Sequence, residues 1–140
     1  MRNRFVAATL IVGLAAVAGS GCYGQSKSLP QKTAHITVDG NSRTSHAISC
    51  TQVQSLLTVE IGVAPGRVRA LLELQPDKPI PQTVDIENFN GFHGVANAGA
   101  GKAQATFRDS TYTITGTAEG TDPDHPDRAK AASFQIETQC

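Results

Sequence analysis

The 140-residue chain lacks tryptophan and holds only two tyrosines, five phenylalanines and one methionine. Bulky aromatic packing is therefore excluded as the main source of stability, and a hydrophobic core must rest on valine, isoleucine, leucine and alanine. A chain of this length predicts a single domain. A small aliphatic core of this kind favours a covalent cross-link as additional support.

Net charge is also absent, because 12 basic residues balance 12 acidic residues. Loss of Arg2 and Arg4 with an amino-terminal signal would leave 10 basic against 12 acidic residues, a net charge of −2. Binding to nucleic acid needs a clustered positive surface. The nearest basic pair, Arg67 and Arg69, is explained more simply as two outward positions of one strand. We therefore expect no nucleic acid among the partners.

A long apolar run is missing as well. A membrane-spanning helix needs about 20 apolar residues, whereas the uncharged run over residues 5–18 has 14. It follows Arg2 and Arg4 and directly precedes Gly19-Ser20-Gly21-Cys22, which is the order of a secretory signal. We predict a signal peptide over residues 1–21 and export of the remainder.

The small residues before Cys22 resemble the bacterial lipobox, in which the cysteine thiol is alkylated with diacylglycerol and the signal is then removed. Gly19 occupies a position where leucine or a similar residue is usual. The alternative is ordinary secretion, with cleavage at a small-residue site and a spare thiol at Cys22. We predict lipidation of Cys22, because an unpaired exported cysteine otherwise has no purpose. The protein would then be held in the cell membrane, on its extracytoplasmic face.

The segment after this cysteine is polar and has no apolar periodicity, with Gly24, Ser26, Ser28 and Pro30. Such a composition predicts a flexible tether between anchor and body. The expected organisation is a signal peptide (1–21), a lipid anchor with its tether (22–34) and a single β domain (35–140).

Three cysteines in an exported chain divide into one that carries lipid and two that pair, which predicts a disulfide between Cys50 and Cys140. If Cys22 paired with either of them, an odd reactive thiol would remain. The predicted bridge would enclose 91 residues, and loop entropy assigns it about 4 to 5 kcal/mol before strain. It would hold the carboxyl terminus in place.

Apolar residues of the body alternate with polar ones, which is typical of strands. Turn-forming pairs such as Asp39-Gly40, Pro65-Gly66 and Asn90-Gly91 interrupt this alternation. The expected strands are 35–38, 45–51, 56–63, 67–75, 82–88, 92–97, 103–108, 112–118 and 133–139.

Short strands at near-regular spacing predict an all-β fold, either a small antiparallel β-sandwich or a strongly curved sheet or open barrel, with one disulfide. The segment from Val68 to Leu74 also fits one or two helical turns. No stretch predicts a long helix.

Two places in the sequence carry residues that could bind a metal ion. His46 stands four residues before Cys50, which would put both on one strand face, but the paired spacings of zinc sites do not follow. The four histidines (His35, His46, His93 and His125) fall in separate elements. The segment Asp122–Asp127 could offer oxygen ligands to calcium, yet it lacks the glycine and distal glutamate of an EF-hand. A solvated loop is the favoured interpretation, and we expect no metal.

Catalytic patterns are equally weak. Asp85 and Glu87 share one side of a strand and could serve as acid and base, although an exposed charged face is more frequent. The glycine-rich Asn97–Lys102 lacks the ending of a phosphate loop and predicts a hairpin loop. No nucleophile elbow frames Ser55, Ser110 or Ser133. We expect no catalytic residue, no cofactor and no enzymatic activity.

Several runs together carry a resemblance to a known family. They are Val38-Asp39-Gly40, Ile48-Ser49-Cys50-Thr51, Asn88-Phe89-Asn90-Gly91, Tyr112 to Asp122, and Ser133 to Cys140. In this order they resemble the mycobacterial LpqH-type surface lipoprotein antigens, or nineteen-kilodalton antigen family.

This resemblance implies a lipid-anchored protein of the mycobacterial cell envelope, without known enzymatic activity and with a disulfide between Cys50 and Cys140. It also implies that host Toll-like receptor 2 recognises the acylated amino terminus. The family's tether is typically rich in threonine and glycosylated, whereas residues 23–34 hold only Ser26, Ser28 and Thr33.

Two functions from different classes follow. The first is a non-enzymatic display or interaction protein, with its chemistry in the lipid on Cys22. The alternative is an envelope carrier whose β body encloses a hydrophobic lipid or glycolipid ligand.

Overall fold

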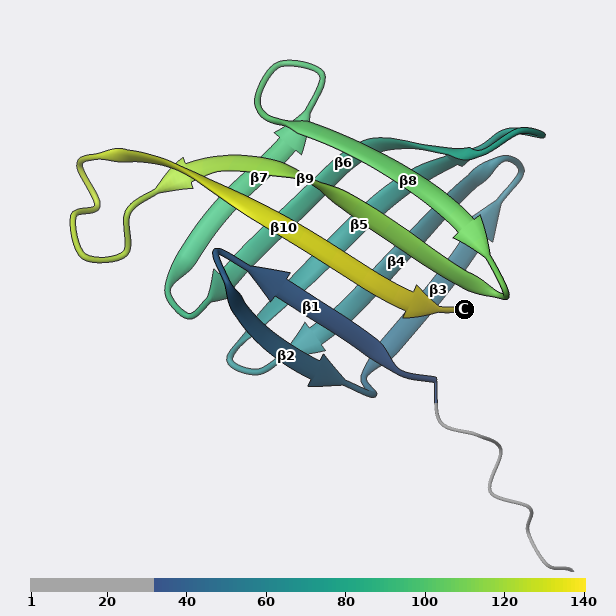
Figure 1. The fold of residues 1–140 in the computed structure, drawn as a ribbon, viewed down its shortest axis with the longest axis horizontal. Coiled ribbons are helices and arrows are strands. Elements are labelled where there is room, and N and C mark those ends of the chain that lie inside the picture. Colours follow the sequence, from purple (N-terminus) through teal and green to yellow (C-terminus); the bar gives the residue numbers. More distant parts are fainter. Residues whose placement is uncertain (1–31) are drawn as a thin grey trace, which may run out of the picture.

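The computed structural model describes residues 32–140. The predicted signal peptide, the lipidation site Cys22 and most of the predicted tether lie outside this range. The described part consists of ten antiparallel strands, with no helix, so the predicted all-β class is confirmed. None of its elements is a helix that could cross a membrane. Figure 1 shows two layers, with β1, β2 and β8–β10 crossing in front of β3–β7.

The strands follow the alternation of the sequence closely. Their bounds are β1 Ala34–Val38, β2 Asn41–Ser45, β3 Ile48–Val53, β4 Leu56–Val63, β5 Gly66–Leu74, β6 Pro79–Phe89, β7 Phe92–Asn97, β8 Lys102–Arg108, β9 Thr111–Thr121 and β10 Ala129–Gln139. Val68 to Leu74, for which helical turns were an alternative, lies in β5. All predicted turn pairs connect neighbouring strands.

One predicted strand was wrong. The expected strand 45–51 contains the end of β2, a break at His46 and Ala47, and the start of β3. The sequence of β2, Asn-Ser-Arg-Thr-Ser, has no apolar alternation because β2 is an edge strand that pairs only with β1 among the described strands. Backbone pairing with β1, and not the pattern of its own side chains, makes β2 a strand.

The core is aliphatic, as the lack of aromatic residues required. Inward positions of β4, β5, β6 and β10 supply most of it, and 21 hydrophobic residues are buried in one cluster. Only Phe89, Phe92 and Phe134 among them are aromatic. Both layers contribute, so the two faces share a single core.

The strand order is β2-β1-β10-β9-β7-β6-β5-β4-β3, with β8 beside β9. One edge of β9 is therefore shared: Thr111–Thr117 pairs with β8, and Glu119–Thr121 pairs with β7. Gly116 and Gly120 lie in the part of β9 where its partner changes from β8 to β7. A Cβ on either would overlap a backbone carbonyl, of Lys102 or His93 respectively. The shared edge thus depends on two residues without side chains.

Where the two ends of the strand order approach each other, β2 meets β4 through polar contacts rather than a ladder. The amide of Gly62 donates to the carbonyl of Ala47, and the hydroxyl of Ser45 donates to the carbonyl of Gly62. The guanidinium of Arg43 donates to the carbonyls of Val63, at 3.0 Å, and Ala64, at 2.7 Å. The sheet is consequently a nearly closed barrel.

We expect Arg43→Ala to lower the free energy of unfolding by about 1 to 3 kcal/mol. The substitution removes two hydrogen bonds from a charged donor, and the guanidinium also lies 5.9 Å from the centre of the Phe89 ring. Urea unfolding followed by circular dichroism measures the loss. Arg108→Ala is the control, since Arg108 is exposed and should change stability by less than about 0.5 kcal/mol. Equal losses in the two variants would contradict a closing role for Arg43.

Candidate functional site

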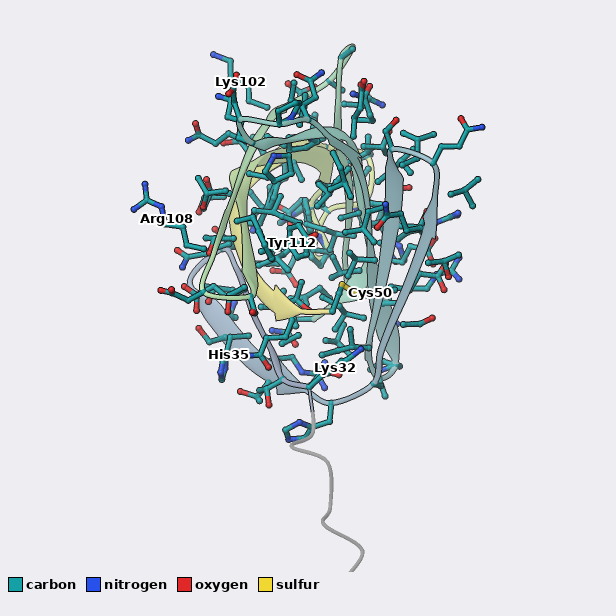
Figure 2. All side chains as sticks on the ribbon, turned by 90° about the vertical axis from the view of Figure 1, so that its right-hand side faces the viewer. Lys32, His35, Cys50, Lys102, Arg108 and Tyr112 are labelled. Carbon is teal, nitrogen blue, oxygen red and sulfur yellow. A yellow bond between two sulfur atoms is a disulfide. The ribbon has the colours of Figure 1, made fainter. Side chains whose placement is uncertain are left out.

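The predicted disulfide between Cys50 and Cys140 is present, with the two Cα atoms 5.8 Å apart. Cys50 lies in β3, the last strand of the rear layer, and packs against the core. Cys140 directly follows β10, a central strand of the front layer. Figure 2 views the molecule from the side on which the two meet. The bridge therefore joins an edge strand of one layer to the middle of the other.

The chain enters the body beside this bridge. Ala34, the first residue of β1, pairs with Thr138 near the end of β10. The Nδ1 of His46 lies 3.2 Å from the carbonyl oxygen of Lys32 and 3.3 Å from Oγ1 of Thr33. His46 thus helps hold the entering segment.

The histidines do not form a metal centre with these cysteines. The expectation that His46 shares a strand face with Cys50 was wrong, because His46 stands in the turn before β3 and Cys50 is oxidised. Within residues 32–140, no three histidine, cysteine or carboxylate side chains lie close enough to share a metal ion. His35 contacts Thr44, and His93 accepts a bond from the amide of Asn88.

The acidic segment Asp122–Asp127 lies in the loop between β9 and β10, as expected. The amide of Asp124 donates to a carboxylate oxygen of Asp122 at 2.9 Å, and His125 lies 3.5 Å from the other oxygen. The hydrogen bond from the Asp124 amide lowers the pKa of Asp122 below its usual range, and the contact with His125 lowers it further. The carboxylate of Asp122 therefore finds its partners within its own loop.

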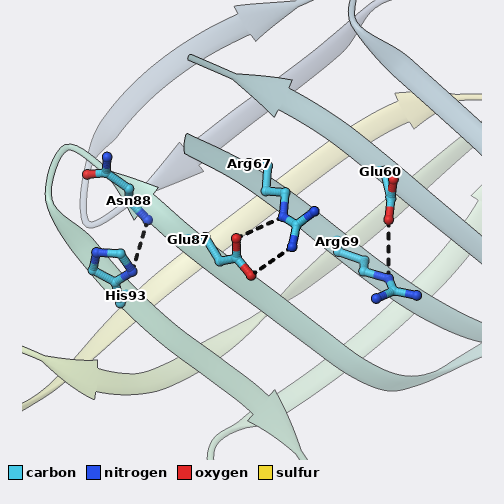
Figure 3. Close-up of polar contacts among 6 residues, drawn as sticks. All are labelled: Glu60, Arg67, Arg69, Glu87, Asn88 and His93. Atoms are coloured by element: carbon cyan, nitrogen blue, oxygen red, sulfur yellow. Dashed lines mark hydrogen bonds and ion pairs between the residues drawn. The ribbon is translucent and has the colours of Figure 1, made fainter. Parts of the chain in front are cut away.

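Asp85 and Glu87 face outward from β6, also as predicted. Arg67 donates two hydrogen bonds to Glu87, at 2.8 and 3.2 Å (Figure 3). These bonds lower the pKa of Glu87 and raise the pKa of Arg67. Arg69 pairs with Glu60 at 3.4 Å on the same face. A carboxylate already engaged by arginine is a poor general acid, so this face is explained as an exposed charged surface.

A hollow of about 650 Å³ lies beside the loop that joins β7 to β8. Asn97 shapes this loop, since its side-chain oxygen accepts hydrogen bonds from the amides of Gly99 and Ala100. The hollow is lined on one side by Ile80–Gln82 and on the other by Lys102 and neighbouring residues of β8. Sequence reasoning missed it, because its two walls are about twenty residues apart in the chain and lie in β6 and β8, which do not pair and are brought together only by the folded sheet.

The fold and the bridge define a class of protein: a small all-β body, closed by one disulfide, in a chain whose third cysteine, Cys22, directly follows a signal-like sequence. Residues 27–140 match the family described as Mycobacterium 19 kDa lipoprotein antigen, and the chain belongs to this family.

Individual relatives agree with that assignment. The chain is 35% identical over 141 residues to LppE of Mycobacterium tuberculosis, described as a probable lipoprotein, covering all of both chains. It is 32% identical over 108 residues to the lipoprotein LpqH of the same species, covering 75% of this chain and 67% of LpqH. LpqH of Mycobacterium avium is 29% identical over 108 residues, covering 75% and 66% respectively.

Proposed function

We propose that this protein is a lipid-anchored surface lipoprotein of the cell envelope, held through Cys22 and displaying its β body on the extracytoplasmic side. The observation that carries the proposal is the use of the cysteines. The chain has three, and the bridge consumes Cys50 and Cys140. Cys22, which directly follows the signal-like segment, is the one left for modification. Membership in a lipoprotein family supports the same chemistry.

The anchor follows from simple energetics. A thioether would join Cys22 to diacylglycerol with palmitate-type chains. Each CH₂ of these chains that is buried in the membrane contributes about 0.8 kcal/mol to binding. One acyl chain gives only marginal membrane binding, whereas two or three hold a protein firmly. Removal of residues 1–21 would free the α-amino group of Cys22 for a third chain.

Host recognition would then reside in the anchor. Toll-like receptor 2 would engage the acyl chains and the first residues, Tyr23 to Ser26, rather than the β body. The body itself is non-enzymatic in this proposal, since its outward carboxylate Glu87 is paired with Arg67 and the carboxylate of Asp122 is satisfied within its own loop. Its role is stable display.

The alternative, a carrier for a hydrophobic lipid or glycolipid, is favoured by one observation, the hollow of about 650 Å³ beside Lys102. The packed cluster of 21 buried hydrophobic residues opposes it, because these side chains occupy the space between the layers. Solvent extraction of body protein produced without Cys22 discriminates the two. Recovery of one lipid per protein would support carriage, and an empty body would support display.

The first test of the proposal is the intact mass of the protein extracted by detergent from its native membrane. We expect the mass of residues 22–140 plus acyl groups, with a gain of two hydrogens on reduction of the bridge. A delipidated aliquot, treated with base to remove ester-linked chains, is the control. A mass without acyl groups, or with residues 1–21 still attached, would contradict the anchor.

A further inference from the structure

Three large hydrophobic side chains are exposed within residues 32–140, and all three lie at the same end of the body. They are Val53, with 65% of its surface exposed, Phe107 with 50% and Leu56 with 42%. Val53 and Leu56 are paired across the β3–β4 turn, and Phe107 stands just before the β8–β9 turn. Single exposed apolar residues need no explanation, but a shared location does.

These side chains lie on neighbouring turns at one end of the body, with Val53 and Leu56 facing outward from β3 and β4 and Phe107 at the mouth of the barrel. The amide of Leu74 donates to the carbonyl of Ser55 at 2.6 Å, which joins the β3–β4 turn to the β5–β6 loop. A hollow of about 290 Å³ between that loop and the β8–β9 hairpin is lined by Leu74, Phe107 and Tyr112. The rings of Phe107 and Tyr112 lie 4.4 Å apart. We call Val53, Leu56, Leu74, Phe107 and Tyr112 the tip surface.

The chain enters the body at this same end. Across the front layer Phe107 pairs with Tyr112, Tyr112 with Thr138, and Thr138 with Ala34. Three strand spacings separate Phe107 from Ala34, which is roughly 15 Å. Figure 2 looks onto this end, with Tyr112 near the centre, Arg108 on one rim and Lys32 where the chain enters. A lipid anchor at Cys22 would therefore be attached at the end of the body that carries the exposed apolar residues.

Charge distinguishes the two ends. Around the tip surface, the basic residues Lys32, Lys78 and Arg108 balance the acidic residues Glu73, Asp77 and Asp109. Long basic side chains can lay their stems on apolar surface while their charged heads stay in water or among headgroups.

The opposite end differs. It bears the β9–β10 loop, in which three aspartates, Asp122, Asp124 and Asp127, outnumber one arginine, Arg128, while Lys130 is paired with Asp39. An anionic lipid surface would repel that end and tolerate the tip surface.

We propose that the tip surface docks on the lipid surface that holds the anchor, with Phe107 and Leu56 entering its interfacial region. This inference rests on the proposed lipidation of Cys22. Thr33 is eleven positions beyond Cys22, so the body stays within about 40 Å of the anchor. A tethered contact is intramolecular, and effective concentrations in the millimolar range allow a few apolar side chains to hold the orientation.

The lack of tryptophan in the chain makes a direct test practical, because a single introduced tryptophan is the sole indole reporter. Phe107→Trp places it on the tip surface, and Pro126→Trp places it in the exposed β9–β10 loop as the control. Both full-length variants are prepared in lipidated form. They are reconstituted into vesicles of phosphatidylglycerol and phosphatidylcholine with brominated acyl chains, which quench indole at short range.

We expect most of the emission of F107W to be lost in brominated vesicles, with a blue shift in unbrominated ones, and neither change in P126W. Equal behaviour of the two reporters in vesicles that carry both proteins would overturn the docking while leaving the anchor intact. Failure of both variants to float with vesicles would overturn the anchor as well, which distinguishes the two proposals. A blue shift of F107W that needs no vesicles and grows with protein concentration would assign the surface to a second copy.

A second pair of variants tests whether docking depends on Phe107 when the tryptophan reporter stands at another position. In L56W the reporter sits on the other hairpin of the tip surface, and L56W/F107D adds a charge that resists entry into the interface. We expect quenching in L56W and loss of that quenching in L56W/F107D. Circular dichroism and the intact bridge confirm folding of the double variant. Unchanged quenching in a folded L56W/F107D would overturn a role for Phe107 in docking.

Discussion

Cys22→Ala is expected to move the protein from almost entirely membrane-bound to almost entirely released. The variant has no thiol to accept diacylglycerol, and removal of the acyl chains removes about 0.8 kcal/mol for each buried CH₂. The exposed apolar residues of the body cannot replace that energy, because only three large ones are exposed in the described part. Detergent-phase partition and flotation with membranes measure the change, in a mycobacterial host that processes the wild type.

Two matched variants control this experiment. Cys22→Ser keeps a side chain of similar size without the thiol and should behave like Cys22→Ala. The double variant Cys50→Ala/Cys140→Ala retains Cys22 and should stay with the membrane, since lipidation needs no bridge. Activation of Toll-like receptor 2 reporter cells should follow the membrane fraction and disappear with Cys22. Membrane retention of Cys22→Ala would contradict the anchor.

Loss of the bridge in Cys50→Ala/Cys140→Ala is expected to lower the free energy of unfolding by about 3 to 5 kcal/mol. The two cysteines are separated by 90 positions, and closing so long a loop in the unfolded chain carries most of the effect. An aliphatic core in a body of this size leaves little reserve. Urea unfolding followed by circular dichroism gives the value.

The wild-type protein under reducing conditions separates the cross-link from the loss of the cysteine side chains. It should show nearly the same decrease as the double variant.

Hydrogen exchange adds a local readout. Among the described strands β3 pairs only with β4, so its amides should lose protection before those of the central strand β5. A decrease of less than about 1 kcal/mol would mean that the core and the contacts of Arg43 hold the layers without the bridge.

Most strands could be predicted because each is encoded locally. In β4 the residues Leu57, Val59, Ile61 and Val63 are buried and their neighbours are not, so the period of two is visible in the sequence itself. β2 could not be found in this way. All five of its residues are polar, so they show no hydrophobic period, and only hydrogen bonding to β1 makes Asn41–Ser45 a strand.

The candidate sites divide in a similar manner. The pairing of Cys50 with Cys140 followed from a count of three cysteines, and the outward position of Glu87 followed from its place in a strand. The bond from Arg67 to Glu87 and the hollow beside Lys102 did not, because each joins residues from different strands whose register the sequence leaves open. His46 was misplaced, since the break between β2 and β3 has no glycine or proline to announce it.

The sequence by itself predicted an export signal and determined the odd number of cysteines, the all-β class and the residues that face inward, since each depends on composition or on neighbours a few positions apart. The tertiary structure decided the order of the strands, the closure of β2 on β4 by Arg43, and the gathering of Val53, Leu56 and Phe107 at the end where the chain enters. These depend on pairings between segments tens of residues apart, and many strand orders satisfy the same alternation. Only packing of both layers into one core selects among them.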